Sequence, residues 1–292
     1  MCQQNVTQYL QDWLAVRSPS LAPSTIDGYQ RSLKNHIAPS IGDVLLSDLS
    51  PSDVLRCLAP LCAAGHTRQA QLVRVLLRVA LADAAAMGLI DHNPVDVVRP
   101  PKHQKQCIAY WSPEVIHKFL SSQRFSPLYH VWLLALLCGL RRGELLGLRW
   151  SDVDLRAAQI HVKNQRMTIA GTTIDKAPKS AAGRRTLPIP PQLVEALRRA
   201  RRGSKSLYIC DLSPQQLRNA LFHACDAAGV PRLHIHGLRH SMATAALEAG
   251  VDVKVLQSIL GHSHYSITAD FYLHPSDSIR SAAIADLSAS VL

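Results

Sequence analysis

Apolar residues recur at every third or fourth position through the first hundred residues of the chain, a spacing typical of amphipathic helices. The pattern is clearest from Thr67 to Met87, where Leu72, Leu76 and Val79 share one stripe. The first part of the chain is therefore predicted to be all-helical. Its predicted helices cover residues 6–16, 22–36, 50–63 and 67–87.

The last of these helices also carries a polar stripe, formed by Thr67, Gln71, Arg74 and Arg78. Side chains at this spacing lie on the same side of a helix. Such a stripe is suited to contacts with DNA phosphates, but a face that meets only solvent has the same pattern. We predict DNA contacts at these four positions and keep the solvated face as the alternative.

A polar segment with two adjacent prolines follows the helical part. Residues 99–105 run Arg-Pro-Pro-Lys-His-Gln-Lys, which is the composition of a stiff linker. We therefore predict a helical domain over residues 1–99, a linker over 100–106 and a second domain over 107–292.

The second domain mixes helical and strand patterns. A helix is predicted to begin at Ser112-Pro113-Glu114, and a buried helix is predicted to end near Gly139. Short β-branched runs, with Gly171 as a turn, indicate strands. The predicted fold class is mainly α with a small antiparallel β-sheet, an α+β arrangement. Its strands cover 159–164, 166–170 and 184–189, and its further helices cover 129–140, 193–202, 214–228, 236–249 and 253–260.

Charge is distributed unevenly between the two domains. The chain has 292 residues and a formal net charge of +11. Residues 1–106 hold 10 Lys and Arg against 8 Asp and Glu, whereas residues 107–292 hold 22 against 13. A strongly basic protein attracts polyanions such as nucleic acid, although positive charge also serves solubility alone.

Composition argues against several other classes. The most apolar run, Val131 to Leu140, is far shorter than the roughly 20 residues that a membrane-spanning helix needs. The first five residues lack the features of a signal peptide, so we expect a soluble, cytoplasmic protein without a membrane partner. The seven cysteines include no Cys-x-x-Cys pair, which argues against a disulfide framework and a zinc knuckle.

Two pairs of residues have the spacing of an anion site. Arg141 precedes Glu144 by three positions, so the carboxylate can orient the guanidinium as an anion clamp. His236 and Arg239 have the same spacing at the predicted start of a helix, where backbone N–H groups favour an anion. Each pair taken alone is also an ordinary structural feature of helices.

A histidine and a tyrosine follow these pairs. His262 comes directly after Gly261, and Tyr272 lies ten residues beyond His262. Arginines and histidines can hold and protonate a phosphodiester, while a tyrosine supplies an attacking oxygen. Because the tyrosine pKa is about 10, its attack needs a base or a positive field nearby. The ordered set predicts a phosphate site with a nucleophile.

These motifs, in this order, resemble the tyrosine recombinase or phage integrase family: Arg-x-x-Glu at Arg141, His-x-x-Arg-His at His236, Leu-Gly-His at Leu260 and the late Tyr272. The resemblance covers nearly the whole chain and implies a helical core-binding domain followed by a catalytic domain. Residues 178–188 are similar to the family's β-hairpin, which carries a catalytic lysine. Lys179 is the candidate for this lysine, and Lys176 is its rival.

The resemblance implies that Tyr272 attacks the scissile phosphate, leaving a 3′-phosphotyrosyl link and a free 5′-hydroxyl. It also implies that Arg141 and Arg239 grip the non-bridging oxygens and stabilise the transition state. With this charge supplied by the protein, neither a metal nor another cofactor is expected.

The resemblance assigns the proton transfers as well. Lys179 protonates the departing 5′-oxygen, His236 assists proton transfer at Tyr272, and His262 donates a hydrogen bond to the phosphate. Glu144 and His240 have supporting roles, and further DNA contacts are predicted at Arg184 and Arg185.

Family behaviour implies the partners. A covalent link keeps the phosphodiester energy, so a second DNA end can reseal the strand without ATP. The family does this as a tetramer on two paired sites, so we expect double-stranded attachment sites, a homotetramer and a directionality factor as partners. The expected role is integration or excision of a prophage or mobile element, with resolution of replicated chromosomes as the alternative.

Other functional classes are less well supported. Six histidines between His234 and His274 suggest metal-dependent phosphoester hydrolysis, but few carboxylates accompany them. A DNA-binding accessory protein without chemistry needs only the basic charge, but the intact motif series argues against it. Topoisomerase-like relaxation shares the chemistry, and a substrate assay separates it. The DNA target sequence is not readable, because base contacts specify a site and phosphate contacts do not.

Overall fold

A computed structural model describes residues 4–101, 109–169, 172–176 and 183–261 of the chain. The chain divides into two compact units, Met1–Gln106 and Cys107–Leu292. Each has its own hydrophobic core. Among the described residues, no helix has the length and apolar character needed to cross a membrane.

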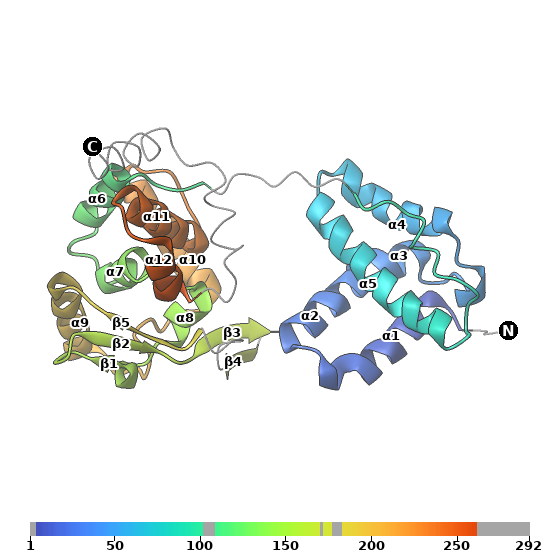
Figure 1. The fold of residues 1–292 in the computed structure, drawn as a ribbon, viewed down its shortest axis with the longest axis horizontal. Helices are drawn as coiled ribbons and strands as arrows, with labels where there is room; N and C mark the ends of the chain where they lie inside the picture. The colour runs from blue at the N-terminus through green and yellow to red at the C-terminus, as the bar shows by residue number, and fades with distance from the viewer. Residues whose placement is uncertain (1–3, 102–108, 170–171, 177–182, 262–292) are drawn as a thin grey trace, which may run out of the picture. The chain divides into compact units, whose positions relative to one another are not determined.

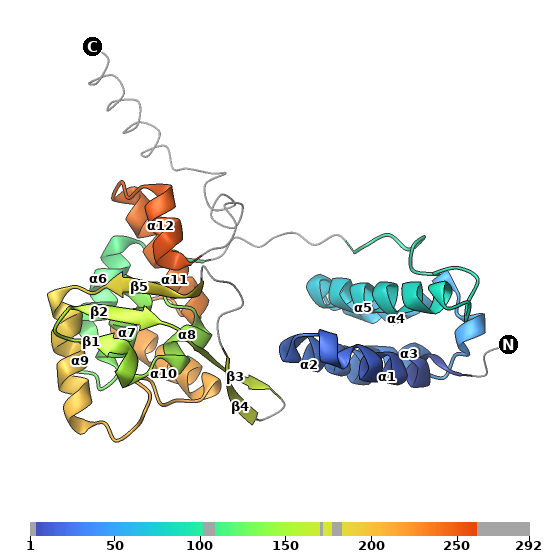
Figure 2. The same ribbon diagram turned by 60° about the horizontal axis from the view of Figure 1, so that its bottom comes forward.

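The described residues of the first unit form helices and no strand beyond one isolated bridge between Asn5 and Leu45, as the helical prediction implies. Figure 2 shows α4 and α5 stacked on α1, α2 and α3. A buried hydrogen bond from the Tyr9 hydroxyl to the Ala80 carbonyl, 2.6 Å long, ties α1 to α5. The helices are α1 (Val6–Arg17), α2 (Pro23–Ser32), a π-helical turn (Leu33–Ile37), α3 (Ala38–Ile41), α4 (Pro51–Ala63) and α5 (Thr67–Ala86), with short 3-10 turns at Ser18–Ser20 and Leu46–Asp48.

Local sequence sets the helix boundaries in this unit. Ser50 caps α4 by accepting a hydrogen bond from the Asp53 backbone, while the Asp53 carboxylate accepts one from the Ser50 backbone. The predicted helix over 22–36 instead widens into the π turn before Pro39. Proline has no N–H to donate within a helix, so the turn before it can take a wider hydrogen-bond pattern.

The described residues of the second unit form several helices and two small antiparallel sheets, which confirms the predicted fold class (Figure 1). One sheet has the strand order β1 (Val153–Asp154), β2 (Gln159–Val162), β5 (Arg185–Pro188), and the other pairs β3 (Gln165–Ile169) with β4 (Thr172–Lys176). The helices are α6 (Pro113–Ser122), α7 (Tyr129–Leu137), α8 (Arg142–Gly147), α9 (Pro191–Gly203), α10 (Pro214–Ala228), α11 (Ile235–Glu248) and α12 (Val253–Leu260), with a 3-10 turn at Trp150–Asp152.

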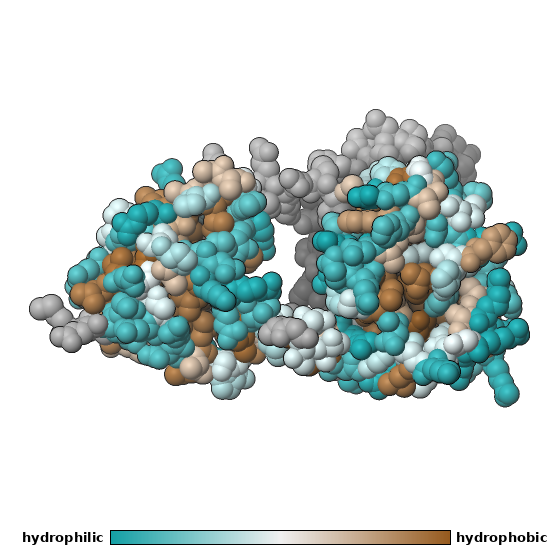
Figure 3. Space-filling model, turned by 180° about the vertical axis from the view of Figure 1, so that it is seen from behind, coloured by the Kyte–Doolittle hydropathy of each residue, from teal (hydrophilic) through white to brown (hydrophobic). Residues whose placement is uncertain are grey.

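The apolar helix α7 lies at the centre of this unit. Its residues from His130 to Leu136 are all buried, and it packs against α6, α8, α9 and α11. A helix surrounded in this way is apolar on every side, which explains the unbroken apolar run in the sequence. On the face shown in Figure 3, hydrophilic residues cover most of each unit, and apolar residues form smaller patches.

The turn after α7 brings distant parts of the chain together. Gly139 has a φ of +57°, which a residue with a side chain rarely adopts. A Cβ atom on Gly139 would lie 2.8 Å from Leu260 Cδ2 and 3.2 Å from Met242 Sδ. The absence of a side chain therefore lets this turn approach both α11 and α12, and the chain then restarts as α8.

Candidate functional site

Arg141 and Glu144 form the predicted pair at the start of α8. The Arg141 backbone N–H donates to Glu144 Oε2 at 3.0 Å, and Arg141 Nη1 donates to Glu144 Oε1 at 2.7 Å. The Arg141 side chain is 36% exposed, whereas that of Glu144 is 3% exposed. The contact predicted from the spacing of three is therefore present, because Glu144 binds both the backbone and the guanidinium of Arg141.

Arg185, at the start of β5, is a second partner of Glu144. Its Nη1 and Nη2 lie 3.2 Å and 2.9 Å from Glu144 Oε1 and Oε2. Burial alone would raise the pKa of Glu144, but hydrogen bonds and positive charge from Arg185 and Arg141 outweigh it, so that pKa lies below its usual value. The carboxylate is therefore ionised and shared by two guanidinium groups.

This position of Arg185 differs from the DNA contact predicted from the sequence. Its side chain is only 7% exposed and is paired inside the protein. The pairing joins residues 41 positions apart, which sequence spacing does not reveal. Arg184, the other predicted contact in this segment, is exposed.

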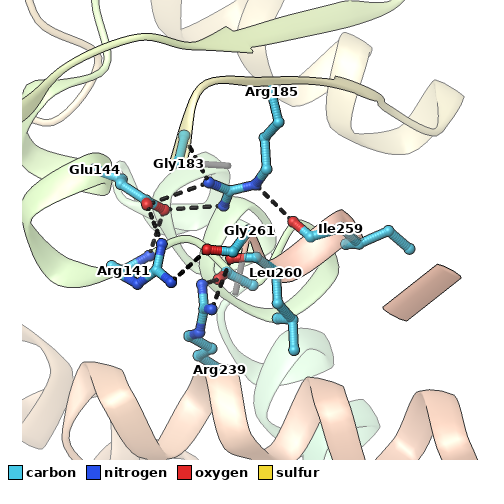
Figure 4. A network of polar contacts seen from close by, with 9 residues as sticks. Arg141, Glu144, Gly183, Arg185, Arg239, Ile259, Leu260 and Gly261 are labelled. Carbon is cyan, nitrogen blue, oxygen red and sulfur yellow. Dashed lines mark hydrogen bonds and ion pairs between the residues drawn. The ribbon is translucent and has the colours of Figure 1, made fainter. Parts of the chain in front are cut away.

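Three arginines converge on the carboxyl end of α12. The consecutive carbonyls of Ile259, Leu260 and Gly261 accept hydrogen bonds from Arg185 Nε (2.6 Å), Arg239 Nη2 (2.7 Å) and Arg141 Nη2 (2.8 Å), respectively (Figure 4). The last carbonyls of a helix have no partner within it and carry partial negative charge. They therefore attract the guanidinium groups, and the site gathers around this terminus.

Arg239 is the most deeply buried of the three. It is 3% exposed, and its Nη1 also donates to the Gly139 carbonyl at 2.5 Å. Burial and the like charge of Arg141 lower the pKa of Arg239. The bond to Gly139 links the predicted Arg141 and His236–Arg239 motifs directly, so the structure brings both motifs into one site.

His236 and His240 lie on α11 beside Arg239. Partial desolvation, followed by the positive charges of Arg239 and Arg141, lowers the pKa of His236. Desolvation and the neighbouring His236 lower the pKa of His240 to about 4. Both imidazoles are therefore neutral at pH 7, and a neutral imidazole has one nitrogen that can accept a proton.

The first turn of α11 is fixed by contacts that the sequence did not indicate. Ser241 Oγ donates to the Gly237 carbonyl and accepts from the Trp111 backbone N–H, both at 2.8 Å. Trp111 Nε1 donates to the Pro231 carbonyl at 2.9 Å. The segment before α6 thus holds the helix that carries His236 and Arg239.

Several predicted site residues lie outside the described part of the chain. These are Lys179, His262 and Tyr272. The rival lysine, Lys176, ends strand β4. Among the residues that the structure describes, no group of His, Cys, Asp or Glu side chains could hold a metal ion.

The polar stripe on α5 binds residues 95–101 of the same unit. Arg74 Nε and Nη2 donate to the carbonyls of Val98 (2.9 Å) and Val95 (3.2 Å), and Gln71 Nε2 donates to the Pro101 carbonyl at 2.9 Å. Arg78 is exposed and pairs with Asp96 at 2.9 Å. The sequence suggested DNA contacts or a face that meets only solvent. Neither interpretation included these contacts with the segment that follows α5. Thr67 is the first residue of α5.

Comparison with known proteins gives consistent matches to both units. A sequence model of the phage integrase family matches residues 116–278, and one of the phage integrase central domain matches residues 6–100. A Mycobacterium tuberculosis protein named as a prophage phiRv2 integrase is 30% identical over 283 residues, covering 88% of this chain and 71% of the relative. A tyrosine recombinase XerC-like protein of Caldanaerobacter subterraneus is 28% identical over 293 residues, covering 87% of this chain and 75% of the relative.

A solved structure has the same fold. The Tn1549 transposon integrase, in complex with a circular intermediate DNA, matches with a TM-score of 0.83 and 20% sequence identity. The match covers 97% of this chain and 99% of that one. Both units of the present chain therefore have counterparts in that fold.

Proposed function

The chain belongs to the phage integrase family of tyrosine recombinases, and from this premise we propose that it is a site-specific recombinase that cuts and rejoins DNA through a 3′-phosphotyrosyl link. Its substrates are double-stranded attachment sites, and its role is the integration or excision of a prophage or mobile element. The relative named as a prophage integrase supports this role.

One observation carries the proposal. Arg141 and Arg239, from separate motifs, bind the adjacent carbonyls of Gly261 and Leu260. Two guanidinium groups that converge in this way suit a phosphodiester, because its non-bridging oxygens accept charge-assisted hydrogen bonds. The developing charge of the transition state strengthens these bonds, which is what catalysis requires.

The proposed reaction assigns one step to each residue. The Tyr272 oxygen forms a bond to phosphorus while the bond from phosphorus to the 5′-oxygen breaks. The tyrosine proton moves to neutral His236, and Lys179 donates a proton to the 5′-oxygen. His262 donates a hydrogen bond to the phosphate. Attack by a 5′-hydroxyl on the phosphotyrosyl bond reverses these steps and reseals a strand.

Complete exchange requires more than one copy of the chain. Two duplex sites contain four strands, and each strand needs one nucleophile. We propose that four copies assemble on two paired sites, and that a directionality factor favours integration or excision. Neither the paired assembly nor that factor changes the chemistry at each tyrosine.

A nicked duplex containing the attachment site tests the proposal. Cleavage near the nick releases a short fragment, so the covalent protein–DNA product accumulates. We expect this product with the wild-type chain and its loss with Tyr272→Phe, while gel-shift binding is retained. Tyr265→Phe, seven residues earlier, is the matched control and should still form it. A covalent product with Tyr272→Phe would assign the nucleophile elsewhere.

Resolution of replicated chromosomes is the second candidate role. The comparisons leave room for it, because the XerC-like relative is named as a tyrosine recombinase and not as a prophage integrase, and it covers 87% of this chain against 88% for the prophage integrase. The two roles differ in substrate, because integration joins two different sites whereas resolution recombines two identical ones. Recombination assays with both substrate pairs distinguish them.

A further inference from the structure

Arg185 links three parts of the second unit from a buried position. Its two Nη atoms bind both oxygens of Glu144 on α8, and its Nε binds the Ile259 carbonyl on α12. Nη1 also lies 3.3 Å from the carbonyl of Gly183, two residues earlier in the chain. The planar guanidinium therefore fixes the start of β5 to two helices at once (Figure 4).

The contacts with Glu144 constrain Arg141. Arg185 binds both carboxylate oxygens, and this bidentate arrangement sets the plane of the carboxylate. The same two oxygens accept from the backbone and side chain of Arg141. A rotation of the carboxylate would therefore move the hydrogen-bond partner of the Arg141 guanidinium.

The contact with α12 constrains Arg141 from its other side. Arg185 binds the carbonyl of Ile259, and Arg141 binds the carbonyl of Gly261, two residues further along. A shift of this helix end would displace the second partner of Arg141. Among the described residues, the Arg141 side chain thus binds the Glu144 carboxylate and the end of α12, and Arg185 binds both of these parts as well.

We propose that Arg185 is a positioning residue, which orients Arg141 through Glu144 and the carboxyl end of α12 without touching DNA. The inference rests on the proposed function. Lysine cannot fully replace Arg185, because a single ammonium group lacks the planar guanidinium that reaches both carboxylate oxygens and a carbonyl. If the Arg185–Glu144 ion pair is purely structural, replacing Arg185 lowers the stability of the protein. Its effect on cleavage then does not depend on the charge of the substrate phosphate.

Two nicked duplexes separate these explanations. One has an ordinary phosphodiester at the cleavage position, and the other has a methylphosphonate there. The methyl group removes the negative charge that Arg141 would stabilise, so correct placement of Arg141 matters less for the second substrate. Single-turnover formation of the covalent product is measured on both, together with gel-shift affinity and its salt dependence.

We expect Arg185→Gln to slow cleavage of the phosphodiester about 10- to 100-fold, as loss of an aligned donor does elsewhere. On the methylphosphonate, the cleavage rate of the same variant should lie within about 5-fold of wild type, because one of the two non-bridging oxygens is absent together with its charge. Arg185→Lys should be intermediate on the phosphodiester. The control Arg199→Gln, which removes an exposed ion pair with Glu195, should match wild type on both substrates.

Two outcomes overturn the proposal. Equal slowing on both substrates identifies a structural ion pair, and weaker DNA affinity with a smaller salt dependence identifies a direct phosphate contact. Arg185→Gln is informative only if it unfolds cooperatively. If it does not, Arg185→Lys, which keeps the charge, replaces it in the comparison. Slowing of Arg185→Lys on the phosphodiester alone then supports the proposal, and equal slowing on both substrates overturns it. If the wild type forms no covalent product on either duplex, the proposed function fails instead.

Discussion

Glu144 holds Arg141 at two points, the backbone N–H through Oε2 at 3.0 Å and Nη1 through Oε1 at 2.7 Å. The same carboxylate binds Arg185, so one buried negative charge serves two positive ones. Such an arrangement is costly to disturb, because removing one partner leaves charge without compensation inside the protein.

Glu144→Gln should therefore destabilise the second unit. The amide keeps the shape of the side chain but removes the charge that compensates the buried Arg185, and we expect a loss of about 3–5 kcal/mol in the free energy of unfolding. Urea denaturation measures this loss. Glu195→Gln breaks an ion pair with both side chains more than half exposed and should change stability by less than about 1 kcal/mol. Equal effects of the two substitutions would contradict the compensation argument.

Gly139→Ala tests the close turn between α7 and α8. The added Cβ requires an unfavourable positive φ and would lie 2.8 Å from Leu260 Cδ2, at the helix end that binds the arginines. We expect a loss of at least about 2 kcal/mol in stability and slower cleavage of DNA. Gly203→Ala, where no atom lies within 4 Å of the new Cβ, is the matched control and should be nearly neutral. An unchanged melting temperature for Gly139→Ala would show that the turn adapts.

Arg74→Met distinguishes intramolecular docking from DNA contact on α5. Because Arg74 binds the carbonyls of Val95 and Val98, we expect a loss of about 1–3 kcal/mol in the stability of the first unit. The dependence of DNA affinity on salt should not change. If Arg74 contacted a phosphate, its loss would instead lower the slope of log affinity against log salt concentration by about one. Arg56→Met, which removes an exposed arginine paired with the partly buried Asp53, is the control for loss of one charge.

The sequence revealed those features of the fold and site that depend on nearby residues. The Arg141–Glu144 pair follows from a spacing of three, and α10 has the predicted bounds because Ser213 caps it and Gly229 ends it. The Arg185–Glu144 pair joins α8 to a strand 41 residues later, and no local pattern encodes it. Strand β4 was missed because its side chains are partly or fully exposed, without the alternation that marks a half-buried strand.

The titration of His236 reports on the charge of Arg141. In the folded protein, desolvation and the charges of Arg239 and Arg141 hold the pKa of His236 below 6.5. Removing one of those charges with Arg141→Gln should raise the NMR titration midpoint of His236 toward 6.5. Arg199→Gln, an exposed substitution on α9, should leave the midpoint unchanged. An unmoved midpoint in Arg141→Gln would place the Arg141 charge too far away to act on a phosphate beside His236.

His240 should make stability depend on pH. Its pKa is lowered to about 4 in the folded protein from an ordinary value of 6.5, so the unfolded chain binds the proton more readily. Its contribution to the free energy of unfolding is therefore complete above pH 6.5 and decreases as the pH falls toward 4. Urea denaturation between those limits should show a shallower pH dependence in His240→Gln than in wild type. His117→Gln, which replaces an exposed histidine, is the control and should keep the wild-type dependence of stability on pH. Identical curves for wild type and His240→Gln would exclude His240 as the group responsible.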